Sequence, residues 1–182
     1  VTRRELTLTS DYKIDIQLAV KGDCDAFSRL YSVIYKDLYH IALCSLRNPH
    51  DAADAVSDAV TDAFSQIKKL RSEDAFKAWV IKILTTKIKK KQSEYINKPT
   101  LDESYAEDTG KDFNFKRTEL ICELDKLNEE ERLILSLSVL GGYSSEEISH
   151  LCGIKPASVR SRLSRTKEKL RKALADIEPQ LN

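Results

Sequence analysis

The chain has 182 residues, of which 32% are charged and 41% are hydrophobic, and its formal net charge is +1. This composition suits an ordered globular protein and argues against an intrinsically disordered chain. Because there are only five glycines and four prolines, long helices are favoured over a sheet-rich fold. The sequence shows no secretory signal, no long apolar run and no CxxC pair among its four cysteines. We therefore expect a cytoplasmic protein with reduced thiols and no direct insertion into a membrane.

Although the net charge is near zero, basic and acidic residues are strongly segregated along the chain. Residues 68–91 contain nine basic side chains against two acids, and residues 155–172 contain eight against one. Clustered basic side chains are typical of surfaces that bind phosphate backbones. We therefore predict two separate basic surfaces in a protein that is neutral overall.

The first half of the chain has helical periodicity. Apolar residues recur at spacings of three and four along residues 12–46, and the stretch KGDCDAF interrupts them. Gly22 can end one helix there, and Asp23 or Asp25 can cap the next. After the turn that Asn48-Pro49 predicts, the run DAADAVSDAVTDAF indicates a further helix from residue 50 onward.

This helix carries a stripe of four aspartates, opposite a small apolar face of alanine and valine. The stripe consists of Asp51, Asp54, Asp58 and Asp62, which are spaced by three, four and four residues. Like charges in a row are mildly unfavourable to a helix. Two interpretations stay open on this chemistry alone: a surface that docks on a basic partner, or a solvated face.

A basic break, KKLRSED, precedes a predicted helix from about Ala75 to Gln92. The expected apolar side consists of Phe76, Trp79, Val80, Ile83 and Leu84, and the expected polar side of Lys77, Lys82, Thr86, Lys87 and Lys90. Aromatic side chains beside a basic stripe can bind a single nucleic-acid strand by stacking on bases and neutralising phosphates. The alternative is that Phe76 and Trp79 are ordinary core residues.

Composition changes at about residue 93, where a stretch with one proline, one glycine and five acids between Asp102 and Asp112 has little apolar periodicity. We interpret it as a flexible acidic linker. Helical patterning then resumes, with Asn128 as a cap and Gly141-Gly142 as a stop. The predicted fold is therefore all-α, with two small helical domains at residues 1–95 and 116–182 joined by a linker at residues 96–115.

Residues 144–165 have the turn chemistry of a helix-turn-helix. Ser144 and Glu147 fit a capping box at the start of a short helix. Gly153 supplies the left-handed conformation that a tight turn needs, and Pro156 suits the first turn of the next helix. Side chains early in that second helix can reach bases in a major groove, and the basic ones that follow can neutralise phosphates. The alternative is a solvated basic helix in an ordinary bundle.

Together the two halves resemble the extracytoplasmic-function sigma factors of bacterial RNA polymerase. The run DAADAVSDAVTDAF resembles the acidic helix with which the family's second domain grips the polymerase clamp helices, and AFKAWVIKI resembles its promoter-melting segment. YSSEEISHLCGIKPASVRSRLSRTKEKLRKAL resembles the fourth domain, which reads the minus-thirty-five element. The resemblance covers roughly residues 12–92 and 116–175.

The resemblance implies site residues by position. Those for polymerase binding are Asp51, Asp54 and Asp58. Those for the minus-ten strand, with a flipped base surrounded by residues 70–74, Phe76 and Thr86, are Arg71, Ser72, Phe76, Lys82, Thr86, Lys87 and Lys90. Those for the minus-thirty-five duplex are Lys155, Ser158, Arg160, Ser161, Arg162, Arg165 and Lys167. The linker would run through the polymerase toward its active centre.

The function implied is that of a specificity subunit that binds core RNA polymerase and promoter DNA and is held inactive by an anti-sigma factor. We expect no catalytic residues, metal, cofactor or small-molecule substrate, because the chain has no glycine-rich phosphate loop and its three histidines are dispersed. The alternative is a conventional helix-turn-helix transcription regulator with a helical sensing or dimerisation domain. Such a regulator would bind palindromic half-sites without polymerase.

Overall fold

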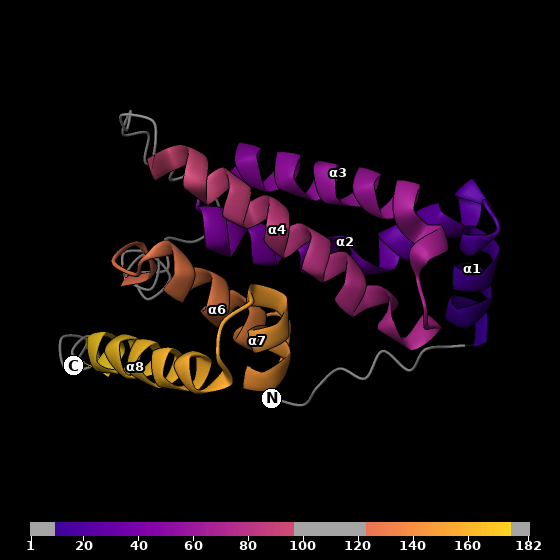
Figure 1. Ribbon diagram of the computed structural model, residues 1–182. Helices are drawn as coiled ribbons and strands as arrows, with labels where there is room; N and C mark the ends of the chain where they lie inside the picture. The colour runs from indigo at the N-terminus through magenta and orange to yellow at the C-terminus, as the bar shows by residue number, and fades with distance from the viewer. Residues whose placement is uncertain (1–9, 97–122, 176–182) are drawn as a thin grey trace, which may run out of the picture. The chain divides into compact units, whose positions relative to one another are not determined.

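The computed structural model describes residues 10–96 and 123–175, and every regular element in these ranges is a helix (Figure 1). This confirms the predicted all-α class. The chain divides into two compact units, residues 1–97 and 98–182, which are described separately. Except for Ile96, which ends a helix, the predicted acidic linker lies outside the described residues.

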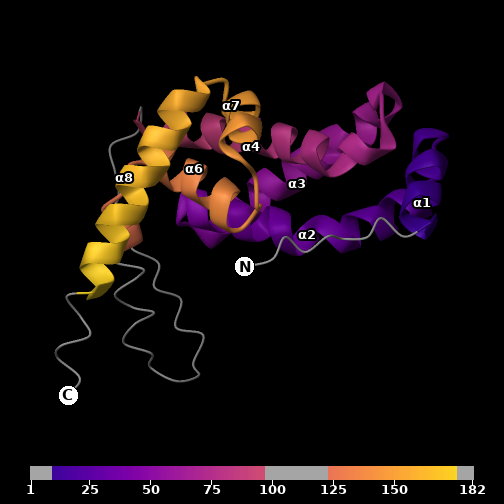
Figure 2. The same ribbon diagram turned by 90° about the horizontal axis from the view of Figure 1, so that it is seen from below.

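Between residues 10 and 96, the first unit contains four α-helices, and two single turns of 3-10 helix follow the third. They are α1 (Ser10–Val20), α2 (Cys24–Leu46), α3 (Pro49–Gln66), η1 (Ile67–Lys69), η2 (Glu73–Ala75) and α4 (Phe76–Ile96). Helices α2, α3 and α4 lie side by side, while α1 lies across one end of the group (Figures 1 and 2). The predicted basic break corresponds to η1, η2 and the residues between them, and α4 ends at Ile96 instead of Gln92.

Side-chain caps start the second and third helices, and the first of these caps lies where the sequence predicts. Asp23 caps α2 by accepting a hydrogen bond from the Ala26 N–H, so it, and not Asp25, is the capping residue. Gly22 precedes it with a φ of 104°, which a residue with a side chain rarely adopts. Asn48 caps α3 by accepting from the N–H groups of the next two non-proline residues.

Helix α3 packs through alanines. Ala52, Ala55, Ala59 and Ala63 are all fully buried. Their small side chains let α2 and α4 approach the α3 backbone closely, because the distance between packed helices depends on the side chains at the contact. The aspartate stripe lies on the remaining surface of the helix, as the spacing predicts.

Phe76, the first residue of α4, lies where several helices meet and is only 1% exposed. Its ring meets Tyr12 of α1 and Phe27 of α2 edge-on, with centroids 6.2 and 6.4 Å apart. The rest of the buried face of α4 consists of Val80, Ile81, Leu84, Thr85, Ile88 and Gln92. Trp79 and Ile83 are only half-buried, so the apolar face is rotated from the one expected.

The second unit contains α6 (Glu129–Val139), α7 (Ser145–Cys152) and α8 (Pro156–Ala175). Asn128 with Glu131, and Ser144 with Glu147, form complete capping boxes at the starts of α6 and α7. Gly153 ends α7 with a φ of 70°, as the sequence predicts for the turn of a helix-turn-helix. Its core consists of Leu127, Leu133, Ile134, Leu135, Leu137, Ile148, Cys152, Val159 and Leu163.

Within residues 10–96 and 123–175, none of the helices combines the length and apolarity needed to cross a bilayer.

Truncation of the Phe76 ring tests whether this residue anchors the first unit. We expect Phe76→Ala to lower the free energy of unfolding by about 3–5 kcal/mol, because it leaves a large cavity where helices meet. Denaturant titration followed by the fluorescence of Trp79, the one tryptophan in the sequence, measures the first unit alone. Phe64→Ala is the control: that ring contacts Phe27 but is 43% exposed, so its loss should be clearly smaller. Equal losses would contradict the anchoring role of Phe76.

Candidate nucleic-acid interface

A hollow of about 270 Å³ lies between the end of α3 and the middle of α4. It is lined by Asp62, Gln66, Ile83, Thr86, Lys87 and Lys90. Three residues of the predicted minus-ten set, Thr86, Lys87 and Lys90, therefore come together here. The Thr86 hydroxyl donates to the carbonyl oxygen of Lys82, one turn earlier, at 3.1 Å. An apolar wall beside cationic and hydroxyl groups is suited to a nucleotide.

Ion pairs between α3 and α4 occupy two of the α4 lysines. Lys87 Nζ lies 2.6 Å from Asp62 Oδ2, and Lys91 Nζ lies 3.0 Å from Asp51 Oδ1 and 3.2 Å from Asp54 Oδ2. The hydrogen bond to Asp62 raises the pKa of Lys87. Burial opposes the charge of Lys91, but its hydrogen bonds to the two aspartates outweigh this effect and raise its pKa. Both ammonium groups therefore stay charged at neutral pH.

The α4 lysines thus fall into an internally paired group and an outward group. Lys77 belongs with the paired ones, because its Nζ lies 2.6 Å from Asp37 of α2. Lys82 and Lys90 are exposed, and neither has an acidic partner among the residues that the structure describes. These two are the lysines of the predicted minus-ten set that are best placed to meet phosphates.

The aspartates of the stripe differ in their exposure. Lys91 pairs with both Asp51 and Asp54, but the Asp51 side chain is only 22% exposed, whereas that of Asp54 is 49% exposed. Asp58 is exposed and has no ion-pair partner within the described part of the chain. Of the three predicted polymerase-binding carboxylates, Asp54 and Asp58 are therefore the ones presented to solvent.

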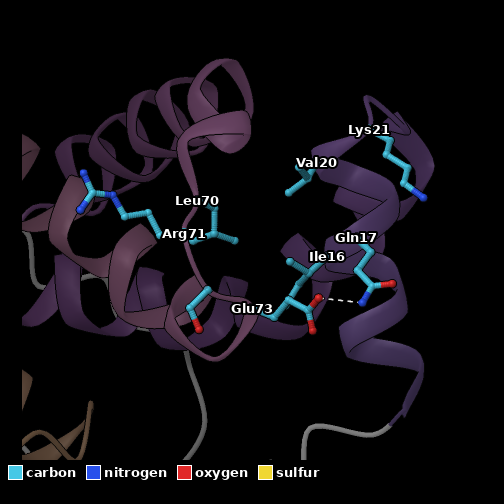
Figure 3. A pocket seen from close by; sticks show the side chains of 8 residues that line it. Ile16, Gln17, Val20, Lys21, Leu70, Arg71 and Glu73 are labelled. Atoms are coloured by element: carbon cyan, nitrogen blue, oxygen red, sulfur yellow. Dashed lines mark hydrogen bonds between the residues drawn. The ribbon is translucent and has the colours of Figure 1, made fainter.

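Arg71 and Ser72 lie away from Thr86, beside a second hollow of about 390 Å³ between α1 and the segment that precedes α4 (Figure 3). Its lining consists of Ile16, Gln17, Val20, Lys21, Leu70, Arg71, Ser72 and Glu73. Five of the seven predicted minus-ten residues therefore line two hollows instead of one, two in this hollow and three in the other. Sequence reasoning missed the α1 wall, because nothing in the local pattern of residues 10–20 connects them to a segment more than 50 residues later.

The prediction that Phe76 contacts a flipped base is wrong. Its ring is buried against Tyr12 and Phe27, so a base could reach it only if the core opened. Helical spacing alone does not show whether an aromatic residue near a basic stripe faces the solvent or the core. For Phe76 the alternative, an ordinary core residue, is correct.

The second helix of the helix-turn-helix presents most of the predicted minus-thirty-five set. Lys155, Arg160, Ser161, Arg165 and Lys167 are exposed, and Ser158 is half-buried. Arg160 Nη1 donates to Glu146 Oε1 in the first turn of α7 at 2.7 Å. This acid, which the sequence prediction missed, holds the Arg160 guanidinium in one orientation at the surface.

Arg162 is the exception in this set. It lies on the inner side of α8, with a buried Nη1 in an ion pair with Glu130 of α6. The prediction that Arg162 faces the DNA duplex is therefore wrong. It lies three positions after Val159 and directly before Leu163, at the edge of the buried face, where the long side chain reaches an acid on the neighbouring helix.

The arrangement is that of two basic surfaces on two helical units, the second a helix-turn-helix. Residues 30–92 match the family description "Sigma-70 region 2", and residues 117–170 match "Sigma-70, region 4". The two regions occur in this order and together cover well over half of the chain. The chain belongs to the extracytoplasmic-function sigma factors of the sigma-70 family.

Known sigma factors match this one over most of their length. It is 27% identical over 181 residues to the ECF RNA polymerase sigma factor SigW of Bacillus subtilis, covering 89% of this chain and 96% of the relative. It is 28% identical to the RNA polymerase sigma factor SigV of the same organism, covering 75% and 83%.

Two solved structures share the fold of this sigma factor. CnrH in complex with the cytosolic domain of CnrY matches with a TM-score of 0.66 and 22% identity, covering 92% of this chain and 99% of that one. The sigma factor RpoE of Bartonella quintana, solved with the anti-sigma factor NepR, matches with a TM-score of 0.62 and 20% identity, covering 82% and 96%.

Sigma factors are transcription initiation factors, and the enzyme to which they supply specificity is RNA polymerase. In the described ranges, no group of three or more histidine, cysteine, aspartate or glutamate side chains is arranged to hold a metal ion.

Comparison of two arginines on α8 tests whether Arg162 holds α8 to α6 through its ion pair with Glu130. We expect Arg162→Ala to lower the stability of the second unit by about 1 kcal/mol, because it removes a half-exposed ion pair and leaves Glu130 without it. Arg165→Ala, a change of the same size on the exposed side, should leave the stability almost unchanged. Native-state hydrogen exchange of the α8 amides measures both. Equal protection in the two variants would show that this ion pair does not hold α8 to α6.

Proposed function

We propose that this sigma factor binds core polymerase through Asp54 and Asp58 and reads a promoter in two parts. The first unit would hold the melted minus-ten strand, and the second would read the minus-thirty-five duplex. The observation that carries this proposal is the presence of two separate outward basic surfaces on units that match sigma regions 2 and 4 in that order.

The outward lysines of α4 support the minus-ten assignment. Lys82 and Lys90 lie on either side of Thr86 along the helix, next to the hollow lined by Ile83. A base extruded from the strand would enter this hollow while the two lysines neutralise adjacent phosphates. Arg71 and Ser72, in the segment before α4, would read a neighbouring base of the same strand.

The exposed face of α8 supports the minus-thirty-five assignment. Arg160, held by Glu146, would reach base edges in the major groove together with Ser158 and Ser161. Lys155, Arg165 and Lys167 would neutralise phosphates on the two sides of the groove.

We further propose that the protein works in the cytoplasm and is controlled by an anti-sigma factor. The fold neighbour RpoE was solved with an anti-sigma factor. An inhibitor that covered Asp54, Asp58 and the outward lysines would block polymerase and DNA together.

In vitro transcription with purified core polymerase, followed by sequencing of the start sites, tests the function directly. Core enzyme with this protein should initiate from a discrete set of promoters, and the free protein should bind the same DNA only weakly. Initiation no better than that of core alone would reject the proposal. Tight binding of palindromic DNA without polymerase would instead favour a conventional regulator.

Charge reversal on the aspartate stripe tests the polymerase contact. We expect the double variant Asp54→Lys with Asp58→Lys to abolish initiation, because two cations would replace the carboxylates that meet a basic partner. Circular dichroism should show unchanged helicity. The matched control reverses Asp11 and Asp25, two exposed acids in the first turns of α1 and α2, and should retain initiation. Unaltered initiation by the first pair would disprove the docking role.

Salt dependence separates the two groups of lysines. We expect Lys82→Ala with Lys90→Ala to weaken binding of the holoenzyme to a labelled single strand from a mapped minus-ten element. The slope of log affinity against log salt should fall by about 0.7 for each lost phosphate contact. Lys77→Ala is the control, because Lys77 is paired with Asp37, and its slope should match the wild type. Fluorescence anisotropy between low and moderate salt measures all three proteins. Identical slopes would refute phosphate contacts by Lys82 and Lys90.

A further inference from the structure

Helix α1 lies outside the residues that match sigma region 2, which begin at residue 30. It nevertheless forms one wall of the hollow beside Arg71 and Ser72. Figure 3 shows Gln17 of α1 and Glu73 facing each other across this hollow, joined by a hydrogen bond. Gln17 Nε2 donates to Glu73 Oε1 at 2.7 Å, between residues 56 positions apart in the sequence.

A second contact joins the same two segments. Lys13 Nζ lies 3.0 Å from Asp74 Oδ1, one turn before Gln17 on α1 and one residue after Glu73. Helix α1 itself is fixed by its inner face, because Ile16 and Ala19 are buried. Helix α1 therefore holds Glu73 and Asp74, two consecutive acids of η2, from a distant part of the chain.

The segment at residues 70–74, here called the minus-ten loop, has little internal support. Its ends are closed by three backbone hydrogen bonds, which the N–H groups of Leu70, Ala75 and Phe76 donate to the carbonyl oxygens of Ile67, Ser72 and Glu73. Neither η1 nor η2 has a side-chain cap hydrogen bond. The conformation of a loop with so few local bonds depends on its neighbours, and α1, which contacts both η1 and η2, is one of them.

We propose that α1 sets the base preference of the minus-ten loop, with Gln17 as the principal positioning residue. This inference rests on the proposed contact of the minus-ten loop with promoter DNA. Gln17 acts through Glu73, because the hydrogen bond between them fixes the backbone at Ser72 and Glu73. A fixed backbone here also fixes the direction of Arg71, whose side chain extends away from α1 (Figure 3). The bond is exposed, so its loss affects the global stability little, whereas it changes where two DNA-contacting side chains point.

The test measures promoter preference position by position. The full chain and core polymerase transcribe a template library randomised across both promoter elements, and the transcripts are sequenced. We expect Gln17→Leu, which keeps the length but loses the amide, to lower the preference for the best base at the position that the loop reads. The loss should be about five-fold, the size expected for one hydrogen bond. Preferences at the minus-thirty-five element should stay unchanged.

Two further variants exclude a merely structural role. Ile14→Gln, at a 48% exposed position on the same helix, should keep the wild-type preference. Gln17→Glu should lose preference, because it sets two carboxylates against each other. Combining it with Glu73→Gln restores an amide–carboxylate bond with its direction reversed, and should recover preference relative to Gln17→Glu alone.

The outcomes separate this inference from the proposed function. No initiation by the wild-type chain would reject the proposed function itself. Initiation by the wild type with an identical preference profile for Gln17→Leu would overturn the positioning role. So would an equal loss of preference at both promoter elements, because that result indicates general destabilisation. A loss of base preference confined to the minus-ten element, with recovery in the double variant, would support the positioning role of Gln17.

Discussion

The burial of the Phe76 ring is the contact on which the geometry of the first unit depends. Phe76 begins α4 and meets Tyr12 of α1 and Phe27 of α2, and Phe27 in turn meets Phe64 of α3 with centroids 5.0 Å apart. One aromatic cluster thereby joins all four helices. The surroundings are apolar enough to raise the pKa of Tyr12 to about 12 by burial. With Phe76 anchored, the short connection from α3 must pass along α1.

This anchor also sets which α4 lysines face the solvent. A helix whose first residue is fixed has a fixed rotation, because successive side chains advance by a constant angle. Lys87 and Lys91 consequently point at α3, where Asp62, Asp51 and Asp54 neutralise them. Lys82 and Lys90 then point outward. The same rotation that builds the α3–α4 interface leaves a basic strip available for a nucleic acid.

The second unit uses the same division of charge. Arg162 and Lys169 are paired with Glu130 and Glu131 of α6, while Arg165 lies outside this set of pairs. Basic residues on α8 thus both hold the helix-turn-helix together and form its outward basic face. A count of cations along the sequence overstates the binding surface in both units, since the internally paired ones are already neutralised.

Local signals in the sequence predicted most of the backbone correctly. Asp23, Asn128 and the Ser144–Glu147 box all cap helices as expected, and Gly153 makes the turn. These features are predictable because a cap or a tight turn involves residues only a few positions apart. The directions in which Phe76 and Arg162 point were not predictable. Helical spacing alone does not distinguish a position at the edge of a buried face from the exposed position next to it.

By itself, the amino-acid sequence determined the all-α class, the helix-turn-helix, the aspartate stripe and the two basic stretches, since each is encoded in spacings of a few residues. Only the tertiary structure decided which charges are available and what surrounds the minus-ten loop. Lys91 finds its acids 37 and 40 residues away, and Gln17 finds Glu73 at a separation of 56. Such pairs form because packed helices bring side chains that are distant in the sequence within hydrogen-bonding distance. No local sequence pattern predicts them.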